Sequence, residues 1–465
     1  MSQKYDFGLI GLGVMGRNFL LNVLDHGYSA AGLDTDESKV KAFLDDSHGK
    51  PGYATTKIED FVRSIETPRI IMLLVPAGAP VDAVLDDIRP LLDKGDLIVD
   101  GGNSFFEDTN RREEQLRKDE IYFFGTGVSG GAKGARTGPS IMPGGDRKAY
   151  KIVQPIFEAV SAKVGDEPCV AYMGAGSAGN YVKMVHNGIE YGIMQIISEF
   201  YQVMSQGFGL SNRALGYAFS EWNRGRLQSF LIEITGEIFS KKDVDGKKYL
   251  LDLILDKAKQ KGTGKWTSQN AMDLGMPVPV IDAAVTMRGI SSFKDRREKL
   301  SQLYNNKIVG QQESVGMDDI EKALYFGFII TYAQGMSQLH EASKTYQYDL
   351  NPETIARIWR GGCIIRAALL EDIMNAYKRN LDLDTLMADQ EFFTLLASTA
   401  PSARKVLTYA IASEIPMMSL SAAIAYFDAM KTNRLPSNLI QAQRDHFGSH
   451  TYERVDQEGI FHTEW

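Results

Sequence analysis

The sequence predicts an α/β plus all-α protein, in which a Rossmann-like doubly wound domain precedes a large all-helical domain and a C-terminal tail. Two observations predict this class. Short apolar runs alternate with helical patterns over the first ~175 residues, and long helical periodicity replaces them from about Gly179 onward. We therefore place the domains at residues 1–178, 179–435 and 436–465.

Five short runs in the first domain have the apolar composition of buried strands. They are Tyr5–Ile10, Ser29–Leu33, Ile70–Val75, Leu97–Asp100 and Tyr122–Gly125. Helical patterns such as Met15–His26 and Glu37–Leu44 lie between them. Strands that alternate with helices favour a parallel sheet with helices on both faces.

The second domain is predicted from stretches with helical periodicity, and the clearest are Tyr181–Gln206, Lys248–Lys259, Met317–Lys344 and Pro352–Arg379. The last residues, from Pro436, are polar and aromatic and are rich in His and Gly. Such a tail is either frayed or docked onto another surface.

The composition is that of an ordinary globular protein, with 44% hydrophobic and 24% charged residues in 465. The longest apolar run, Ile70–Val75, is too short to span a bilayer, and Lys4 and Asp6 do not fit a signal peptide. The two cysteines, Cys169 and Cys363, do not suggest a disulfide framework. We expect a cytoplasmic protein without membrane association.

The net charge of −8 argues against nonspecific nucleic-acid binding, which requires a basic surface. An anionic ligand would need a local cluster of Arg and Lys. The stretches Arg111–Arg112 and Lys294–Lys299 are interleaved with acidic residues, which is typical of solvated helix faces. No grouping of Cys, His and carboxylate residues has metal-ligand spacing, so we expect no required metal.

A glycine-rich motif follows the first predicted strand and opens the first predicted helix. Its residues are Gly11, Leu12, Gly13, Val14, Met15 and Gly16. The first glycine allows a tight turn, the second lets a pyrophosphate approach the backbone, and the third lets helix and strand pack closely. The helix N-terminus adds partial positive charge. The motif predicts a dinucleotide-binding site, and a glycine-rich turn without a ligand is the alternative.

Asp34 stands at the end of the second predicted strand, 18 residues beyond Gly16. A carboxylate there accepts hydrogen bonds from the adenosine ribose hydroxyls, which favours NAD over NADP. A solvated turn aspartate is the alternative. Later strand ends supply Val75, Pro76, Ala77 and Asn103, and ligands bind at such carboxyl ends of strands.

One predicted helix carries polar residues at the spacing i, i+3, i+4 and i+7, which places them on one face. They are Lys183, His186, Asn187 and Glu190. A solvated helix face is the plain interpretation. A Lys and a Glu also suit the oxidation of a secondary alcohol, in which a base accepts the hydroxyl proton and an acid later protonates an enol. Lysine is a base only where burial or nearby cations lower its pKa.

Two glycine-containing segments are candidates for binding a substrate. Ser129–Gly131 follows a strand and offers a hydroxyl and backbone N–H groups, with a plain turn as the alternative. Residues 261–266, Lys-Gly-Thr-Gly-Lys-Trp, lack the glycine spacing and the final Ser or Thr of a Walker A motif. Lys261 and Thr263 could still bind phosphate, and a helix-ending glycine turn is the alternative.

Longer motifs, in order along essentially the whole chain, resemble those of the 6-phosphogluconate dehydrogenase family. They are Ile10-Gly-Leu-Gly-Val-Met-Gly-Arg-Asn18, Gly127-Val-Ser-Gly-Gly131, Lys183-Met-Val-His-Asn-Gly-Ile-Glu-Tyr191, Gln260-Lys-Gly-Thr-Gly-Lys-Trp266 and, in the tail, Leu439-Ile-Gln-Ala-Gln-Arg-Asp445 with Gly448-Ser-His-Thr-Tyr452. The resemblance implies oxidative decarboxylation of 6-phosphogluconate to ribulose 5-phosphate, a step of the pentose phosphate pathway.

The resemblance also implies residue roles. Lys183 would be the general base, and Glu190 would donate a proton to the enol. Substrate contacts are implied for Asn103, Ser129, Gly130, Gly131, His186, Asn187, Tyr191, Lys261 and Arg288. The family's tail enters the partner subunit's active site, which implies a homodimer whose sites share Arg444 and His450.

Several positions depart from the family's common pattern. Asp34-Thr35-Asp36 stands where many members have Asn-Arg-Thr, and Val75-Pro76-Ala77 where they have Val-Lys-Ala. The two cations that would pair with the extra phosphate of NADP are therefore replaced, and negative charge is added. We predict an enzyme that prefers NAD, with NADP as the weaker cofactor; Lys39 swinging toward the phosphate would instead give dual specificity. Further departures, for which we have no functional account, are Ala132–Lys133, Ile193 and His446.

Two other functions compete with this one. A simple β-hydroxyacid dehydrogenase shares the first-domain pattern and the lysine helix, but such enzymes are shorter and lack the second helical half and the tail. A cofactor-sensing binding protein without activity is the other, and the presence of both Lys183 and Glu190 argues against it. Titration with cofactor and 6-phosphogluconate, followed by detection of reduced nicotinamide and CO2, separates the three.

Overall fold

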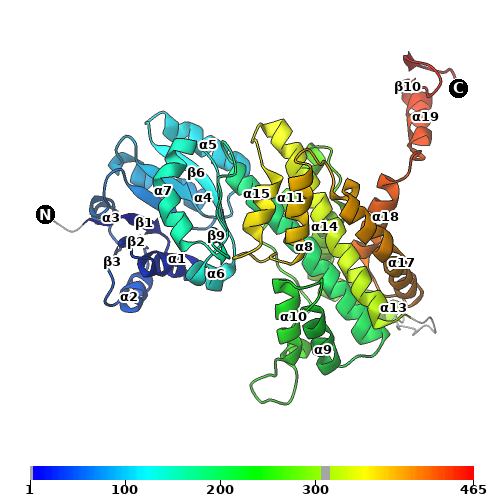
Figure 1. Ribbon diagram of the computed structural model, residues 1–465, viewed down its shortest axis with the longest axis horizontal. Coiled ribbons are helices and arrows are strands. Elements are labelled where there is room, and N and C mark those ends of the chain that lie inside the picture. Colours follow the sequence, from blue (N-terminus) through cyan, green and yellow to red (C-terminus); the bar gives the residue numbers. More distant parts are fainter. Residues whose placement is uncertain (1–3, 305–314) are drawn as a thin grey trace.

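The computed structural model describes residues 4–304 and 315–465, and its first domain is built on a seven-stranded sheet in the order β3-β2-β1-β4-β5-β6-β7 (Figure 1). The strands are β1 (Phe7–Ile10), β2 (Ala30–Leu33), β3 (Gly52–Thr55), β4 (Ile70–Leu73), β5 (Leu97–Asp100), β6 (Tyr122–Val128) and β7 (Ile141–Pro143). Strands β1 to β6 pair in parallel, and β7 runs antiparallel to β6. The predicted doubly wound sheet is confirmed.

Helices cover both faces of this sheet because its strands send alternate side chains into two separate cores. Phe7 and Leu9 join the core that α1 and α7 cover, whereas Ile71 and Leu73 join the core that α3 and α4 cover. The helices of this domain are α1 (Val14–Asp25), α2 (Glu37–Asp46), α3 (Ile58–Ser64), α4 (Ala79–Ile88), α5 (Phe106–Arg117), α6 (Gly131–Thr137) and α7 (Arg147–Val160).

Two strands of the sheet lie outside the predicted set, and each lacks the apolar run that marks a buried strand. β3 is a partly exposed edge strand with the sequence Gly-Tyr-Ala-Thr. β7 is only three residues long and ends in Pro143. Proline is tolerated there because β7 lies at the other edge of the sheet.

The second domain is helical, and its first helix, α8 (Ala178–Gln202), packs against β6 on one side and against α11, α12 and α14 on the other. A π-helical turn, Val203–Gly207, continues α8. The other helices are α9 (Asn212–Trp222), α10 (Phe230–Ser240), α11 (Thr263–Asp273), α12 (Pro279–Ser292), α13 (Lys294–Leu303), α14 (Met317–Tyr346), α15 (Pro352–Trp359), α16 (Leu369–Arg379), α17 (Gln390–Ala412) and α18 (Met418–Met430).

The predicted helix at Lys248–Lys259 is wrong. Only a 3-10 turn forms, at Leu250–Leu253, and the side chains of Ile254 and Leu255 that follow it are each 60% exposed. Apolar residues at helical spacing do not hold a helix without a core for them to contact.

The predicted single helix at Pro352–Arg379 is two helices, α15 and α16. The break contains Gly362, whose φ is 66° and where a Cβ would lie 2.6 Å from the carbonyl carbon of Pro139. The helix therefore ends where the chain passes closely against the first domain.

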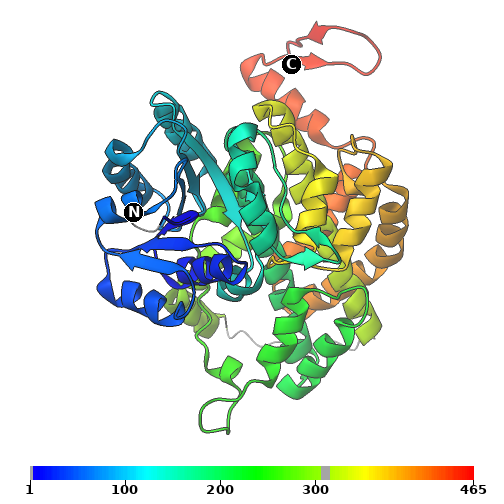
Figure 2. The same ribbon diagram turned by 60° about the vertical axis from the view of Figure 1, so that its left-hand side comes forward.

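The tail is an ordered unit that stands away from the rest of the chain (Figures 1 and 2). It consists of α19 (Ser437–Gly448) and a hairpin of β10 (Tyr452–Glu453) and β11 (Ile460–Phe461). Asp445 is its buried centre and accepts hydrogen bonds from the backbone N–H groups of Thr451 and Thr463 and from the Trp465 indole. These bonds fold the last residues back onto α19.

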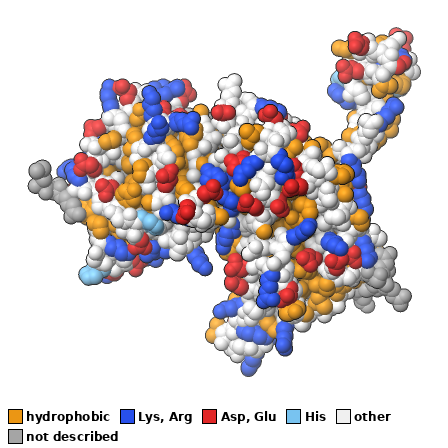
Figure 3. Space-filling view, viewed as in Figure 1, with side chains coloured by type: hydrophobic (Ala, Val, Ile, Leu, Met, Phe, Trp, Pro, Cys, Tyr) orange, Lys and Arg blue, Asp and Glu red, His pale blue; other side chains and the backbone are white. Residues whose placement is uncertain are grey.

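Acidic and basic side chains are intermixed over the face of both domains drawn in Figure 3. Within residues 4–304 and 315–465, no helix has the length and hydropathy needed to cross a bilayer.

Candidate active site

The glycine-rich loop between β1 and α1 has the geometry that its glycines predict. Gly11 has a φ of 101°, and a Cβ on Gly16 would lie 1.8 Å from the carbonyl oxygen of Gly11. Gly13, the N-cap of α1, has no atom within 4 Å of its would-be Cβ. This open space at a helix N-terminus fits a pyrophosphate. The other loop residues are the buried Leu12 and, in the first turn of α1, Val14 and Met15.

Asp34 closes this loop from the end of β2. Its side chain is 8% exposed and accepts hydrogen bonds from the N–H groups of Leu12 (2.8 Å) and Asp36 (3.0 Å). Lys39 Nζ lies 3.3 Å from the same carboxylate. Thr35 and Asp36 are exposed, and Asp36 caps α2. Each oxygen of Asp34 thus accepts from one backbone N–H and lies within 3.4 Å of Lys39 Nζ.

The loops after β4 and β5 touch at the same edge of the sheet. A Cβ on Gly102 would lie 3.2 Å from the carbonyl oxygen of Val75. Pro76 and Asn103 are exposed and Ala77 is partly exposed, so these residues are open to a ligand at the strand ends.

Helix α8 lies directly against β6, because glycines in the strand leave room for it. A Cβ on Gly125 would lie 1.4 Å from Asn180 Oδ1, and a Cβ on Gly127 would lie 2.5 Å from the Cβ of Lys183. Asn180 also donates a hydrogen bond to the carbonyl oxygen of Gly102 (3.3 Å). The lysine helix is therefore fixed to the strand ends of the first domain.

Three of the four predicted polar residues of α8 are buried, so a solvated helix face is ruled out. Lys183 is 6%, His186 0% and Asn187 8% exposed. His186 Nδ1 lies 3.5 Å from Lys183 Nζ and 3.1 Å from Asn187 Oδ1. His186 Nε2 lies 3.2 Å from Ser129 Oγ. A chain of polar contacts thus joins both domains.

Burial is the largest cause of the pKa shifts of these groups. It lowers the pKa of Lys183, which the charge of Glu190 opposes, and it lowers the pKa of His186, with Lys183 as a second cause. Burial raises the pKa of Glu190, which Lys183 and Arg288 oppose. A neutral lysine and a protonated glutamate are the forms that a base and an acid require.

Gly130 and Gly131 have φ values of 107° and 62° and open α6 beside this group. A Cβ on Gly130 would lie 2.6 Å from the carbonyl oxygen of Gly362, whereas nothing lies within 4 Å of one on Gly131. A ligand therefore has room to approach the backbone at Gly131.

Cationic groups flank the other end of the polar face. The Arg288 guanidinium stacks on the Tyr191 ring, 3.4 Å from its centroid. A Cβ on Gly264 would lie 2.3 Å from the same ring, so the loop of residues 261–266 packs against α8. Thr263 is buried there and Lys261 is exposed. This loop caps α11, which begins at Thr263.

The tail residues Arg444 and His450 are not brought to this group within one chain. Both are exposed on the projecting tail (Figures 1 and 2). Arg444 donates a hydrogen bond only to Gln441 of the same helix (3.0 Å) among the contacts in the described residues.

Sequence reasoning missed three residues that support the site. Asn180 lies three residues before Lys183, so the helical spacing of the polar stripe was the signal that could have identified it. Trp359 packs edge-on to His186 with ring centroids 5.5 Å apart, a long-range contact that no local pattern reveals. Arg112 was predicted to be solvated, which is wrong: it is 1% exposed. Arg111 beside it does lie at the surface.

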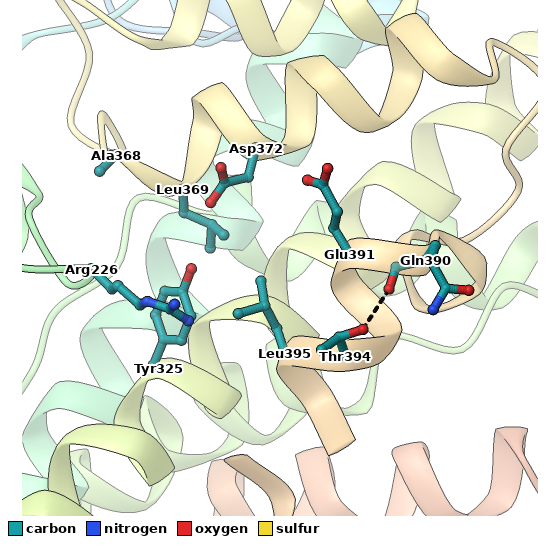
Figure 4. A pocket seen from close by; sticks show the side chains of 9 residues that line it. All are labelled: Arg226, Tyr325, Ala368, Leu369, Asp372, Gln390, Glu391, Thr394 and Leu395. Carbon is teal, nitrogen blue, oxygen red and sulfur yellow. Dashed lines mark hydrogen bonds between the residues drawn. The ribbon is translucent and has the colours of Figure 1, made fainter. Parts of the chain in front are cut away.

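A separate hollow of about 550 Å³ lies among α14, α16 and α17 (Figure 4). Asp372 and Glu391 line it together with Arg226. Burial and the charge of Glu391 raise the pKa of Asp372. Two carboxylates make this hollow a poor site for a phosphate, and none of its lining residues is a predicted site residue.

The fold and the site together define a class. A dinucleotide-binding sheet whose strand ends face a buried lysine and a carboxylic acid is the arrangement of a nicotinamide-dependent dehydrogenase. Over residues 4–304 and 315–465, no cluster of three or more His, Cys, Asp and Glu residues is placed to hold a metal ion.

Comparisons with known proteins name the family. The model for the NAD binding domain of 6-phosphogluconate dehydrogenase matches residues 6–174, and that for the C-terminal domain of 6-phosphogluconate dehydrogenase matches residues 179–465. The chain belongs to the 6-phosphogluconate dehydrogenase family.

Individual relatives cover the whole chain. It is 51% identical to the NADP(+)-dependent, decarboxylating 6-phosphogluconate dehydrogenase of Bacillus subtilis (strain 168), over 100% of this chain and 99% of the relative. It is 48% identical to the decarboxylating enzyme of Escherichia coli (strain K12), with the same coverage. The structure of Plasmodium falciparum 6-phosphogluconate dehydrogenase, studied apo, with NADP+ and with 6-phosphogluconate, superimposes with a TM-score of 0.96 at 44% identity, covering 99% of this chain and 100% of that one.

Proposed function

We propose that the protein oxidises 6-phosphogluconate and releases CO2 to give ribulose 5-phosphate, with NAD as its preferred hydride acceptor. The observation that carries this proposal is the buried group of Lys183, His186 and Asn187, which lies between Ser129 of the first domain and Glu190 further along α8. When bound, the nicotinamide would serve as the hydride acceptor.

Lys183 acts first, as the base. Because burial lowers its pKa, Nζ is available in the neutral form to accept the proton of the hydroxyl β to the carboxylate as hydride leaves the same carbon. His186, 3.5 Å away, is neutral and does not compete for that proton, since its pKa is also lowered by burial.

The same residues then serve decarboxylation. The product of oxidation is a β-keto acid, and the C–C bond to its carboxylate breaks as CO2 leaves, with the electron pair moving onto the carbonyl oxygen. Protonated Lys183 donates a hydrogen bond to this forming enolate. Glu190, whose pKa burial raises, delivers a proton to carbon and completes ribulose 5-phosphate.

Substrate binding follows from the charge and hydrogen bonding of the surrounding residues. A phosphate and a carboxylate need local cations in an acidic chain, and Lys261 and Arg288 supply them within one subunit. Polar and backbone groups complete the binding set, which comprises Asn103, Ser129, Gly130, Gly131, His186, Asn187, Tyr191 and Thr263.

The preference for NAD rests on the end of β2. The buried carboxylate of Asp34 faces the place where NADP carries its extra phosphate, and Thr35 and Pro76 offer no cation to pair with it. Lys39 is held by Asp34 at 3.3 Å, which weakens its attraction for a phosphate. The Bacillus subtilis relative is named NADP(+)-dependent, so this chain would differ from it in cofactor.

Kinetics with both cofactors test the preference. With saturating 6-phosphogluconate, kcat/KM for NAD should exceed that for NADP by at least about tenfold, equivalent to ~1.4 kcal/mol. The double variant Thr35→Arg with Pro76→Lys should raise kcat/KM for NADP, and Lys39→Met, which removes the cation paired with Asp34, should lower it further. If the wild-type kcat/KM for NADP equals that for NAD, the cofactor preference is refuted. The proposed reaction is not affected by that result.

The assembly we propose is a homodimer in which each tail completes the other subunit's site. Helix α19 exposes Leu439 (61%), Ile440 (59%) and Phe447 (73%), and none of its residues belongs to the apolar core of the helical domain as described. Apolar side chains on a projecting helix require cover. Arg444 of α19 and His450, which follows the end of this helix, would then reach the bound phosphate of the partner site.

A further inference from the structure

Arg112 of α5 is the most deeply buried cation of the first domain in the part of the chain that the structure describes, with a side chain that is 0% exposed. Its Nε and Nη2 donate to the two oxygens of Asp82, at 2.8 and 3.0 Å. Nη2 also donates to the carbonyl oxygen of Gly78 at 3.0 Å. This side of the guanidinium therefore holds the loop after β4 and the start of α4.

The opposite side of the same guanidinium faces the loop after β5. Nη1 lies 3.4 Å from Ser104 Oγ and 3.7 Å from Asp100 Oδ2. Asp100 is fully buried and accepts hydrogen bonds from Ser104 Oγ (2.6 Å) and the N–H of Gly102 (3.0 Å). Asp100, Gly102 and Ser104 bracket Asn103, so their positions set that of Asn103.

We propose that Arg112 is a positioning residue for the cofactor site, which fixes the Val75–Ala77 loop and the Asn103 loop at one separation. A rigid planar guanidinium with donors on both edges can hold two loops at once, which a lysine ammonium cannot do with the same geometry. The role rests on the proposed function, since it assumes that a nicotinamide cofactor lies across these two loops. Arg112 is not itself a catalytic residue, because it lies behind the loops and touches no reacting group.

The matched pair Arg112→Lys and Arg111→Lys tests this role. Both residues contact Asp82, but Arg111 does so from the surface, with a side chain that is 51% exposed.

The affinities for the cofactor and for 6-phosphogluconate are each measured by equilibrium titration of the free enzyme. Arg112→Lys should weaken cofactor binding by about tenfold or more, since displacements of ~1 Å carry effects of this size. Its affinity for 6-phosphogluconate should fall less than its affinity for the cofactor, because Asn103 is the only proposed substrate contact on these two loops. Arg111→Lys should match wild type in both.

A folded Arg112→Lys protein with wild-type cofactor affinity overturns the role, as does equal weakening of both ligands, which indicates general loss of structure. If Arg112→Lys does not fold, Ser104→Ala removes a single hydroxyl from the same network and should weaken cofactor binding by about three- to tenfold; unchanged binding then overturns the role. Failure of the wild type to turn over 6-phosphogluconate while it still binds cofactor would refute the proposed function and leave this inference standing.

Discussion

At the scale of single residues, the environment of Lys183 governs its chemistry. The spacing of the polar stripe on α8 is equally compatible with a solvated face, so the sequence pattern by itself left two interpretations. Burial at 6% exposure decides between them, because an ordinary surface lysine stays protonated near neutral pH. The functional interpretation therefore depends on tertiary packing.

Removal of this base gives the first expected outcome. Lys183→Ala should reduce kcat by about 10²- to 10⁴-fold, which is the usual effect of losing a positioned general base. Circular dichroism and thermal unfolding should show an intact fold, and Lys151→Ala, at an exposed position of α7, serves as the control. Turnover near the wild-type rate in folded Lys183→Ala would remove Lys183 from the mechanism.

The pH profile of kcat/KM should have two limbs. On the acid side the rate rises with pH as Lys183 loses its proton, and on the alkaline side it falls as Glu190 loses the proton it must donate. Glu190→Gln should abolish the alkaline limb. The acid limb should stay where it is, because Glu190 is already protonated, and so uncharged, over that pH range. An unchanged alkaline limb in Glu190→Gln would assign it to another group.

Residue-level prediction failed where a side chain's partners are distant in sequence. Arg112 stands in a run of charges that looks solvated, yet its partner Asp82 is 30 positions away. At Lys248–Lys259 the error is the opposite one, a packed helix predicted where none forms. The apolar residues have helical spacing, but the side chains of Ile254 and Leu255 are exposed. In both cases local patterns carry no information on which surface is covered.

At the scale of elements, close packing through glycine positions the site. Glycines in the β1–α1 loop and in β6 let helices approach the backbone closely. The contact in the β1–α1 loop was predictable from the spacing of the glycine-rich motif. The second was not predictable, because Gly125 and Gly127 read only as the end of a strand until α8 is seen against them. The sequence predicted most helices and strands correctly, but it did not predict where one helix ends and the next begins.

Two glycines of the same loop should respond differently to alanine. Gly16→Ala places a Cβ 1.8 Å from a carbonyl oxygen and should destabilise the cofactor-free protein by roughly 1–3 kcal/mol. Gly13→Ala has open space and an ordinary φ of −60°, so the stability of the cofactor-free protein should be unchanged. Its cofactor affinity should fall by about tenfold or more, because the methyl group occupies space meant for the pyrophosphate.

Thermal unfolding without cofactor and equilibrium binding measure these two effects separately. Wild-type cofactor affinity in Gly13→Ala would mean that the dinucleotide does not pass over this loop.

At the scale of the whole molecule, the tail of α19 and the β10–β11 hairpin projects from the rest of the described chain. Its own fold is complete around Asp445, so its position away from the body is not a matter of fraying. The resemblance to the family, not the residue pattern, supplied the expectation of shared sites, since polar tails in general predict no particular partner.

Mixed dimers test the sharing of sites. Lys183→Ala and Arg444→Ala should each be nearly inactive alone. When they are mixed in equal amounts and allowed to exchange subunits, each mixed dimer has one intact site, so about a quarter of wild-type activity should return. Native mass spectrometry confirms exchange, and a mixture of two different Lys183 variants is the control that should stay inactive. Exchange without recovery would place each tail in its own subunit's site.

The central claim is that oxidation and loss of carbon occur together on 6-phosphogluconate. Its most direct test is one incubation of the purified protein with NAD and 6-phosphogluconate labelled at the carboxyl carbon, in which labelled CO2 and reduced nicotinamide are followed in parallel. We predict equal amounts of both at every time point, and neither in Lys183→Ala. Reduced nicotinamide without labelled CO2 would indicate a simple alcohol dehydrogenase and contradict the account.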